Sequence, residues 1–207
     1  NGQIDSRGGT IELDDNAVIR NGDIKGNLIV RGTTTLGDTA NIATCVVLSN
    51  VPIPSFAQVL VGGQADVTLE NKITFNATGP IDNSNIAFAG GSPAPTELKI
   101  SNLGVTLAGR GKVNLFHATA HVVNAGLTTP GLTQLVIEPD LLIDGVNGKL
   151  GNDDNIGIHN RGTIAARGVG GSDVFTVSPG IGANASGSAD LLNDGTVRAT
   201  DGGTLLF

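Results

Sequence analysis

Apolar and polar residues alternate over many short stretches of this chain. Alternation of this kind puts successive side chains on opposite faces of a β-strand, so each stretch predicts a strand with one buried face. No stretch of about a dozen residues combines helical apolar spacing with freedom from Gly and β-branched runs. The clearest alternating stretches are Val67-Thr68-Leu69, Ile73-Thr74-Phe75, Leu98-Lys99-Ile100, Val105-Thr106-Leu107 and Val113-Asn114-Leu115.

The predicted strands are short, and turn-forming residues separate them. Most span about three to five residues, with Gly, Asn, Asp or Pro between them. An antiparallel sandwich usually needs longer strands and more aromatic residues, whereas a parallel β-helix uses short strands, small inward side chains and frequent turns. The pattern therefore predicts an all-β fold, a right-handed parallel β-helix (β-solenoid) with coils of about 20 residues.

Three stretches interrupt this rhythm and are expected to form inserted loops that bulge from the stack of coils. They are the Pro-punctuated residues 49–55 and 89–96 and the Gly/Ala/Ser-rich residues 178–188. None of them has the composition of a linker between domains. We therefore expect a single β-solenoid domain over residues 1–207, forming a segment of a longer or polymerising protein.

Composition favours a narrow interior. Hydrophobic residues make up 39% of the chain, yet Met, Trp and Tyr are absent and Phe occurs six times. Val, Ile, Leu and Ala therefore supply nearly all of the apolar bulk, which suits the thin core of a solenoid. The 31 glycines indicate many turns.

The charge of the chain excludes one class of partner. The net charge is −7 and the isoelectric point is about 4.7, with the basic residues scattered. A nucleic-acid interface needs clustered Lys and Arg, so we expect no nucleic-acid partner. No apolar run is long enough to predict insertion into a membrane. An acidic, amide-rich surface favours an extracellular or cell-surface location.

One phrase recurs along the chain. The sequence begins NGQIDSRGGTIEL, ends NDGTVRATDGGTLLF, and carries part of the phrase as NRGTIAA at residues 160–166. A recurring strand–turn–strand phrase is typical of stacked repeats. We expect it to form the corner and strand of successive coils, and its presence near both ends leads us to expect continuation from one copy to the next.

The stretch from Lys112 to Ala166 strengthens this interpretation, with phrases such as GKLGN at 148–152 and NRGTIAA at 160–166. It resembles the repeats of bacterial secreted β-helical proteins, of the autotransporter-passenger and filamentous-adhesin type. The resemblance implies a fold and carries no catalytic signature. Physically, Asn before a turn can stack on Asn of the next coil as an amide ladder, and Gly is expected to supply a positive φ at the corner.

Several residues could carry chemistry. His117 and His121 have a spacing that binds zinc on a helix, but they fall on a predicted strand and turn, and no Glu follows the first His. We expect them at the surface or at the edge of the core, with a metal pair as the alternative. Cys45 is expected as a small buried hydrophobe, with a reactive thiol as the alternative. The acidic turns 14–16 and 152–155 are expected to be solvated, with calcium binding as the alternative.

Paired carboxylates would be needed for glycoside cleavage on a β-helix. The chain lacks Trp and Tyr, the residues on which sugars commonly stack. We therefore assign no catalytic, cofactor-binding or metal-binding residue and expect no enzyme. The carboxylates that would be candidates are Asp66, Glu70, Asp82, Glu97, Glu138, Asp140 and Asp144.

The sequence thus predicts a structural or adhesive extracellular protein. Its coils would form a rigid rod that associates end to end by β-strand pairing. The alternative is a polysaccharide-active or glycan-binding β-helix, which would have surface glycans as partners.

Overall fold

The structure of the chain is a computed structural model that describes residues 2–13, 18–30, 35–42, 46–49, 52–53, 58–61, 66–78, 84–88, 96–124, 133–151, 156–170, 173–179 and 191–207. Every regular element in these ranges is a β-strand. The strands are β1 (Gly2–Leu13), β2 (Val18–Val30), β3 (Thr35–Ile42), β4 (Val46–Ser49), β5 (Pro52–Ile53), β6 (Gln58–Val61), β7 (Asp66–Asn76), β8 (Asn85–Phe88), β9 (Thr96–Leu115), β10 (Ala120–Asn124), β11 (Thr133–Ile137), β12 (Leu141–Gly145), β13 (Lys149–Leu150), β14 (Ile156–Asn160), β15 (Thr163–Arg167), β16 (Val174–Val177), β17 (Leu191–Asn193), β18 (Thr196–Thr200) and β19 (Thr204–Leu206).

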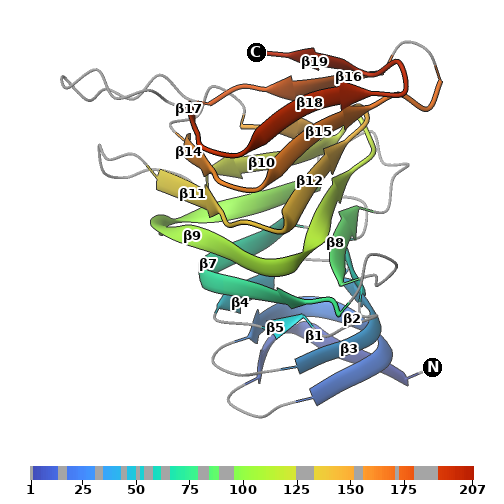
Figure 1. The fold of residues 1–207 in the computed structure, drawn as a ribbon. Coiled ribbons are helices and arrows are strands. Elements are labelled where there is room, and N and C mark those ends of the chain that lie inside the picture. Colours follow the sequence, from blue (N-terminus) through green and yellow to red (C-terminus); the bar gives the residue numbers. More distant parts are fainter. Residues whose placement is uncertain are drawn as a thin grey trace.

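The strands pair in parallel along three ladders, each of which rises from coil to coil (Figure 1). Ladder A joins β1, β2, β3, β6, β8, β9, β12, β15 and β18. Ladder B joins β1, β2, β4, β7, β9, β10, β13, β16 and β19. Ladder C joins β2 to β3 and, further along the chain, joins β5, β7, β9, β11, β14 and β17. The chain visits the ladders in the order A, B, C in each coil, which confirms the predicted parallel β-solenoid.

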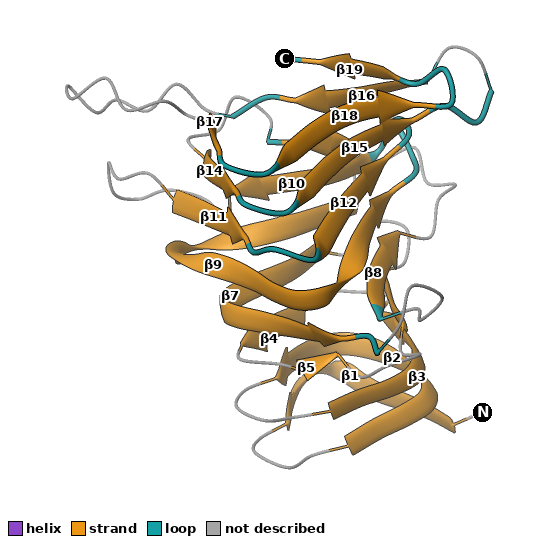
Figure 2. Ribbon diagram, viewed as in Figure 1, coloured by secondary structure: helices purple, strands orange, loops and turns teal. Residues whose placement is uncertain are grey.

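The coils differ in length because segments are inserted between the strands. Gly2 pairs with Gly22, whereas Thr163 pairs with Thr196 in a much longer coil. Figure 2 shows the described loops at the corners between strands. One predicted loop was partly wrong: Pro52–Ile53 forms β5, which pairs with β7, and Ile53 is fully buried. A short strand at Pro is compatible with pairing because Pro lacks only the backbone donor.

Strand β9 merges three stretches that the sequence predicted as separate strands. It runs through all three ladders, over residues 96–100, 104–110 and 111–115. The chain bends at Gly104 and Gly109, where φ is +84° and +79°. Residues with a side chain rarely adopt this conformation, so glycine lets one strand turn two corners.

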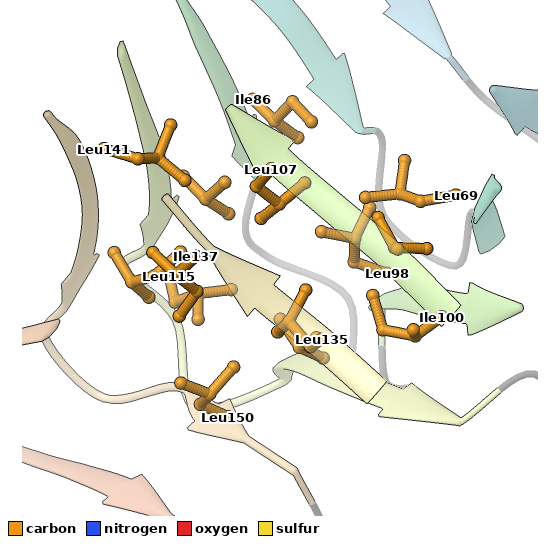
Figure 3. Close-up of a cluster of buried hydrophobic side chains, with 14 of the residues drawn as sticks. Leu69, Ile86, Leu98, Ile100, Leu107, Leu115, Leu135, Ile137, Leu141 and Leu150 are labelled. Atoms are coloured by element: carbon orange, nitrogen blue, oxygen red, sulfur yellow. The ribbon is translucent and has the colours of Figure 1, made fainter. Parts of the chain in front are cut away.

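The core is a single column of side chains that point inward from the ladders. Figure 3 labels ten of its members, which lie on six strands, β7, β8, β9, β11, β12 and β13. Each alternating stretch predicted from the sequence places its outer two residues in this core, as at Val113 and Leu115, which are fully buried. Each such side chain contributes about 1.5–3 kcal/mol to the stability of the fold. Phe75 and Phe175 are the largest of them.

Candidate functional site

A hollow of about 510 Å³ opens at the corner between ladders A and B. Three successive coils build this corner with residues 116–119, 146–148 and, among the residues that the structure describes, 168–170 and 173. The middle corner is the shortest, so its residues lie deeper than those of its neighbours. Val146 is 6% exposed, whereas Val169 of the longest corner is 75% exposed. We call this site the corner hollow; its lining residues are Phe116, Val146, Asn147, Arg167, Val169, Gly170 and Asp173.

Two glycines let the middle corner lie this deep. A Cβ on Gly145 would stand 2.2 Å from the ring of Phe175, and one on Gly148 would stand 2.8 Å from the carbonyl oxygen of Ala120. Neither approach is possible for a residue with a side chain. The backbone of the short corner therefore packs directly against the core and against the preceding coil, and the longer corners project beyond it.

Arg167 forms one wall of the corner hollow. Its Nη2 donates to Asp144 Oδ2 at 2.9 Å, and its guanidinium carbon lies 5.1 Å from the centroid of the Phe116 ring. The ion pair and the cation–π contact hold the guanidinium in one orientation. Its Nε is buried and has no hydrogen-bond partner among the described residues.

Asp144 lies behind this wall on ladder A, between Asn114 of the preceding coil and Ala165 of the next. It is 7% exposed. Burial raises the pKa of its carboxyl above the ordinary value, although the nearby charges of Arg167 and Lys112 act in the opposite direction. Desolvation of the carboxylate therefore outweighs its ion pair.

Asp173 also lines the corner hollow. Its Oδ2 accepts hydrogen bonds from the backbone N–H of Val169 at 2.6 Å and of Gly170 at 2.8 Å. Its Oδ1 accepts a hydrogen bond from Asn147 Nδ2 at 2.8 Å. The N–H of Val169, then the amide of Asn147 and the N–H of Gly170, lower the pKa of this carboxyl, so Asp173 is ionised at neutral pH. The same bonds fasten the long corner to the short one.

The two carboxylates have pKa values that are shifted in opposite directions, as in many acid–base pairs. Each shift has a structural explanation, however. Asp144 is bound to Arg167, and Asp173 accepts three hydrogen bonds from its own surroundings. The corner hollow thus offers a fixed guanidinium, an ionised carboxylate and apolar walls, a set of groups suited to binding.

A second polar cluster lies at the corner between ladders C and A. Arg161 Nη1 donates to Glu138 Oε1 at 3.2 Å, and Arg161 Nε donates to His159 Nε2 at 3.3 Å. His159 Nε2 also lies 2.8 Å from Asp194 Oδ2. These contacts join three successive coils, so the cluster ties the stack together at its surface.

The Asn ladder predicted from the repeated phrase is present at this same corner. Asn160 is fully buried and its Nδ2 donates to Asn193 Oδ1 at 2.6 Å. The positive φ predicted for glycine at the corners occurs at Gly151 of the phrase GKLGN and at Gly202, where φ is +82° and +80°, but not at Gly162 or Gly195. The latter two are needed because stacked corners approach closely: a Cβ on Gly195 would lie 2.2 Å from the carbonyl oxygen of Gly162.

The histidine pair lies at the surface of the AB corner. His117 is exposed, and His121 is partly exposed, with Nε2 3.2 Å from the carbonyl oxygen of Ala118. Within the ranges that the structure describes, no group of three or more His, Cys, Asp or Glu side chains could hold a metal ion. Cys45, Asp82 and the acidic turns 14–16 and 152–155 lie outside those ranges.

Several of the candidate carboxylates in the described chain are held in ion pairs. Glu97 pairs with Lys99 at 3.4 Å, and Glu138 pairs with Arg161. Asp140 is exposed at a corner with φ of 70°. Asp144 is the candidate that contacts a residue of the corner hollow. Glu70 is partly exposed on β7, and for Asp66 the structure describes only the backbone.

Sequence reasoning missed Arg167 and Asp173. A signal for Asp173 exists, because it follows the Gly-rich stretch 168–171, and Asp commonly binds the backbone of such a turn. Nothing local marks Arg167, whose partners Asp144 and Phe116 come from two earlier coils.

The last described coil runs from β17 to β19. Among the described strands, the partners of β17, β18 and β19 all belong to the preceding coil. The inward residues Leu191, Val197 and Leu205 of the last described coil are only partly buried against the core, and Phe207 is 69% exposed. At the opposite end of the stack, Ile11 of β1 is likewise only partly buried (Figure 1).

In the described residues there is no helix with the length and apolarity needed to cross a bilayer. Comparisons of the chain with protein-family models, with curated proteins and with solved structures gave no match.

Proposed function

We propose that this chain is a structural or adhesive protein that acts outside the cell or on its surface, as the resemblance to bacterial secreted β-helical proteins implies. Its activity is mechanical and involves no catalysis. Parallel coils about 4.8 Å apart form a stiff rod, and the rod lengthens when copies associate end to end. The observation that carries this proposal is the last described coil, whose strands pair with the preceding coil and whose inward apolar residues are only partly buried.

The free edge of β18 has a defined set of donors and acceptors. Thr196 N–H donates to Gly162 O, and Thr200 O accepts from Gly168 N–H, so these residues pair with the preceding coil. In a parallel strand, alternate residues direct their backbone groups to opposite sides. Val197 and Ala199 therefore direct theirs to the open side, where they can pair with a further strand.

The apolar residues of the last described coil also favour end-to-end association. Leu191, Val197 and Leu205 are only partly buried in the described structure, and full cover would add part of the about 1.5–3 kcal/mol that complete burial of such a side chain contributes. We propose that the covering surface is β1 of a second copy, which presents the partly buried Ile11 at the opposite end of the rod. Contact between two different ends does not close on itself, so repetition of it gives a filament.

The Asn ladder gives this association a preferred register. Asn193 receives the bond from Asn160, while its own Nδ2 makes only a 3.5 Å contact with Gly195 O. An amide acceptor on the added coil would continue the ladder in one alignment.

Composition supports the proposed environment and partners. A net charge of −7 with few charged residues gives a surface of amides, hydroxyls and glycine, suited to glycans at a cell surface and unsuited to nucleic acid. We propose no insertion into membranes.

The test compares the wild-type chain with Ala199→Pro, and with Ala199→Ser as a matched control. Proline removes the free-edge N–H of an exposed residue and leaves the bonds of Thr196 and Thr200 to the preceding coil in place. Sedimentation velocity and electron microscopy over rising concentration should show filaments for the wild type and the Ser variant, and association about tenfold weaker for the Pro variant. Monomers alone at every concentration, or equal assembly of all three chains, would refute the proposal.

A further inference from the structure

We propose that the corner hollow is a binding site for a neutral saccharide. This inference does not depend on end-to-end association, because the corner hollow lies on the side of the rod, between coils whose strands are paired on both edges. Its volume of about 510 Å³ lies in the range of small-molecule sites.

The polar groups of the corner hollow complement the hydroxyl groups of a sugar. Arg167 supplies donors, since only Nη2 of its terminal guanidinium nitrogens bonds Asp144 and its side chain is 41% exposed. Asp173 supplies ionised oxygens that accept from hydroxyl groups, and its side chain is fixed by Asn147. A donor and an acceptor that line the same hollow can engage hydroxyl groups of one ring.

The apolar groups complement the C–H surface of the same ring. Val146 forms part of the deep surface of the corner hollow, and Val169 stands 75% exposed at its rim. An exposed valine next to a fixed guanidinium gains from cover by a ligand that is apolar on one side and polar on the other. A sugar ring has this character. Phe116 contributes less, because Arg167 already occupies a position over its ring.

Charge selects a neutral sugar over an acidic one. Asp173 places an ionised carboxylate in the lining itself, whereas the guanidinium of Arg167 is already paired with Asp144, and the whole chain carries −7. A uronate would meet net repulsion at this site, whereas an uncharged sugar would not. The binding energy from one ring is modest, so we expect a dissociation constant of about 1 mM.

The experiment measures binding of glucose, galactose, mannose and N-acetylglucosamine by saturation-transfer NMR and titration, with glucuronate as the acidic probe. At least one neutral sugar should bind, and more tightly than glucuronate. Val169→Ser should weaken binding about fivefold without harming the fold, because Val169 is mostly exposed. Val174→Ser, a change of another exposed valine outside the lining, is the matched control and should bind as the wild type does.

Arg167→Gln should lower affinity more than tenfold, with folding checked by circular dichroism. Ala199→Pro should leave sugar binding unchanged, which separates this proposal from filament assembly. Absence of binding by all four neutral sugars at about 50 mM, tighter binding of glucuronate, or equal effects of the two valine substitutions would overturn the proposal.

Discussion

Asn160 and Asn193 occupy the same position in consecutive coils and share a hydrogen bond, in which Nδ2 of Asn160 donates to Oδ1 of Asn193 at 2.6 Å. The same amide also donates to Thr196 O at 3.2 Å. The bond lies at the start of the repeated phrase, and it links the last described coil to the coil below it. It therefore offers a direct way to test what holds the stack together.

Asn160→Ala should destabilise the protein by about 2 kcal/mol, because it removes two hydrogen bonds from a fully buried side chain and leaves Thr196 O without one of its donors. Asn193→Ala should cost about 1 kcal/mol or less, since Asn193 is exposed and water can replace its bonds. Urea unfolding measures the difference, and amide exchange in β17 and β18 locates it. Equal losses for the two variants would contradict a buried role for Asn160.

Gly162→Ala should cost at least about 2 kcal/mol, because the added Cβ would lie 2.5 Å from the carbonyl oxygen of Leu141 in the coil below. Gly202→Ala is the informative comparison. A Cβ on Gly202 would meet nothing within 4 Å, but φ is +80°. The substitution should therefore destabilise the protein only through its unfavourable backbone conformation, by about 1 kcal/mol. Thermal unfolding of both variants tests whether close stacking of corners, and not a positive φ, requires glycine in the repeated phrase. A smaller loss for Gly162→Ala would show that the corners can separate.

Arg167→Ala should destabilise more than the double variant Asp144→Ala with Arg167→Ala. The single change leaves a carboxylate that is 7% exposed without its ion-pair partner, whereas the double change removes both charges. Because Arg167 is itself partly exposed, we expect a coupling of only about 1–2 kcal/mol in a double-mutant cycle at neutral pH. Additive effects would mean that water already solvates Asp144.

The raised pKa of Asp144 makes the stability of the protein depend on pH. A carboxyl group whose pKa is higher in the folded state binds its proton more tightly there, so its ionisation lowers stability as pH rises from the ordinary Asp pKa through the folded value. Asp144→Asn should therefore flatten the fall in stability across that window. A comparison of urea midpoints for the two proteins from about pH 3 to about pH 7, the range around the ordinary Asp pKa, would show this flattening.

Asp173 should show the opposite pH dependence. Its pKa is lowered by the hydrogen bonds it accepts, so its contribution is fully present above the unfolded pKa and is lost as pH falls through the folded value. Asp173→Asn places an NH2 group against the donors of Val169 and Gly170 or of Asn147. Exchange of those backbone amides should rise in the variant at neutral pH and match the wild type in acid. Unchanged exchange at neutral pH would show that the corner holds its shape without the carboxylate.

Much of the fold could be predicted from local sequence, because each strand shows its inward face by alternation. Val105 and Leu107 are buried as their pattern indicates, and the Asn ladder follows from the phrase that contains Asn160. The short strand at Pro52–Ile53 was missed, since proline normally argues against pairing and only the partner β7 reveals it.

The corner hollow could not be predicted in the same way. It arises from the relative lengths of three corners, and these can be compared only after the coils have been placed in register. Arg167, Asp144 and Phe116 are distant in sequence and meet because Gly145 pairs with Ala166 on one side and with Leu115 on the other. Register is a property of the whole stack, and no local pattern encodes it.

The short corner at residues 146–148 indicates that the shape of the surface can vary independently of the core. The ladders on either side of it keep their pairing whatever the length of the connection, as the much longer corner at residues 168–173 demonstrates within the same molecule. Residues could thus be added to or removed from such corners to raise ridges or open recesses along the rod while the inward column stays unchanged. The coils form a rigid support, and the lengths of the corner loops determine the shape of its surface. Relatives with the same coils could therefore display different binding surfaces.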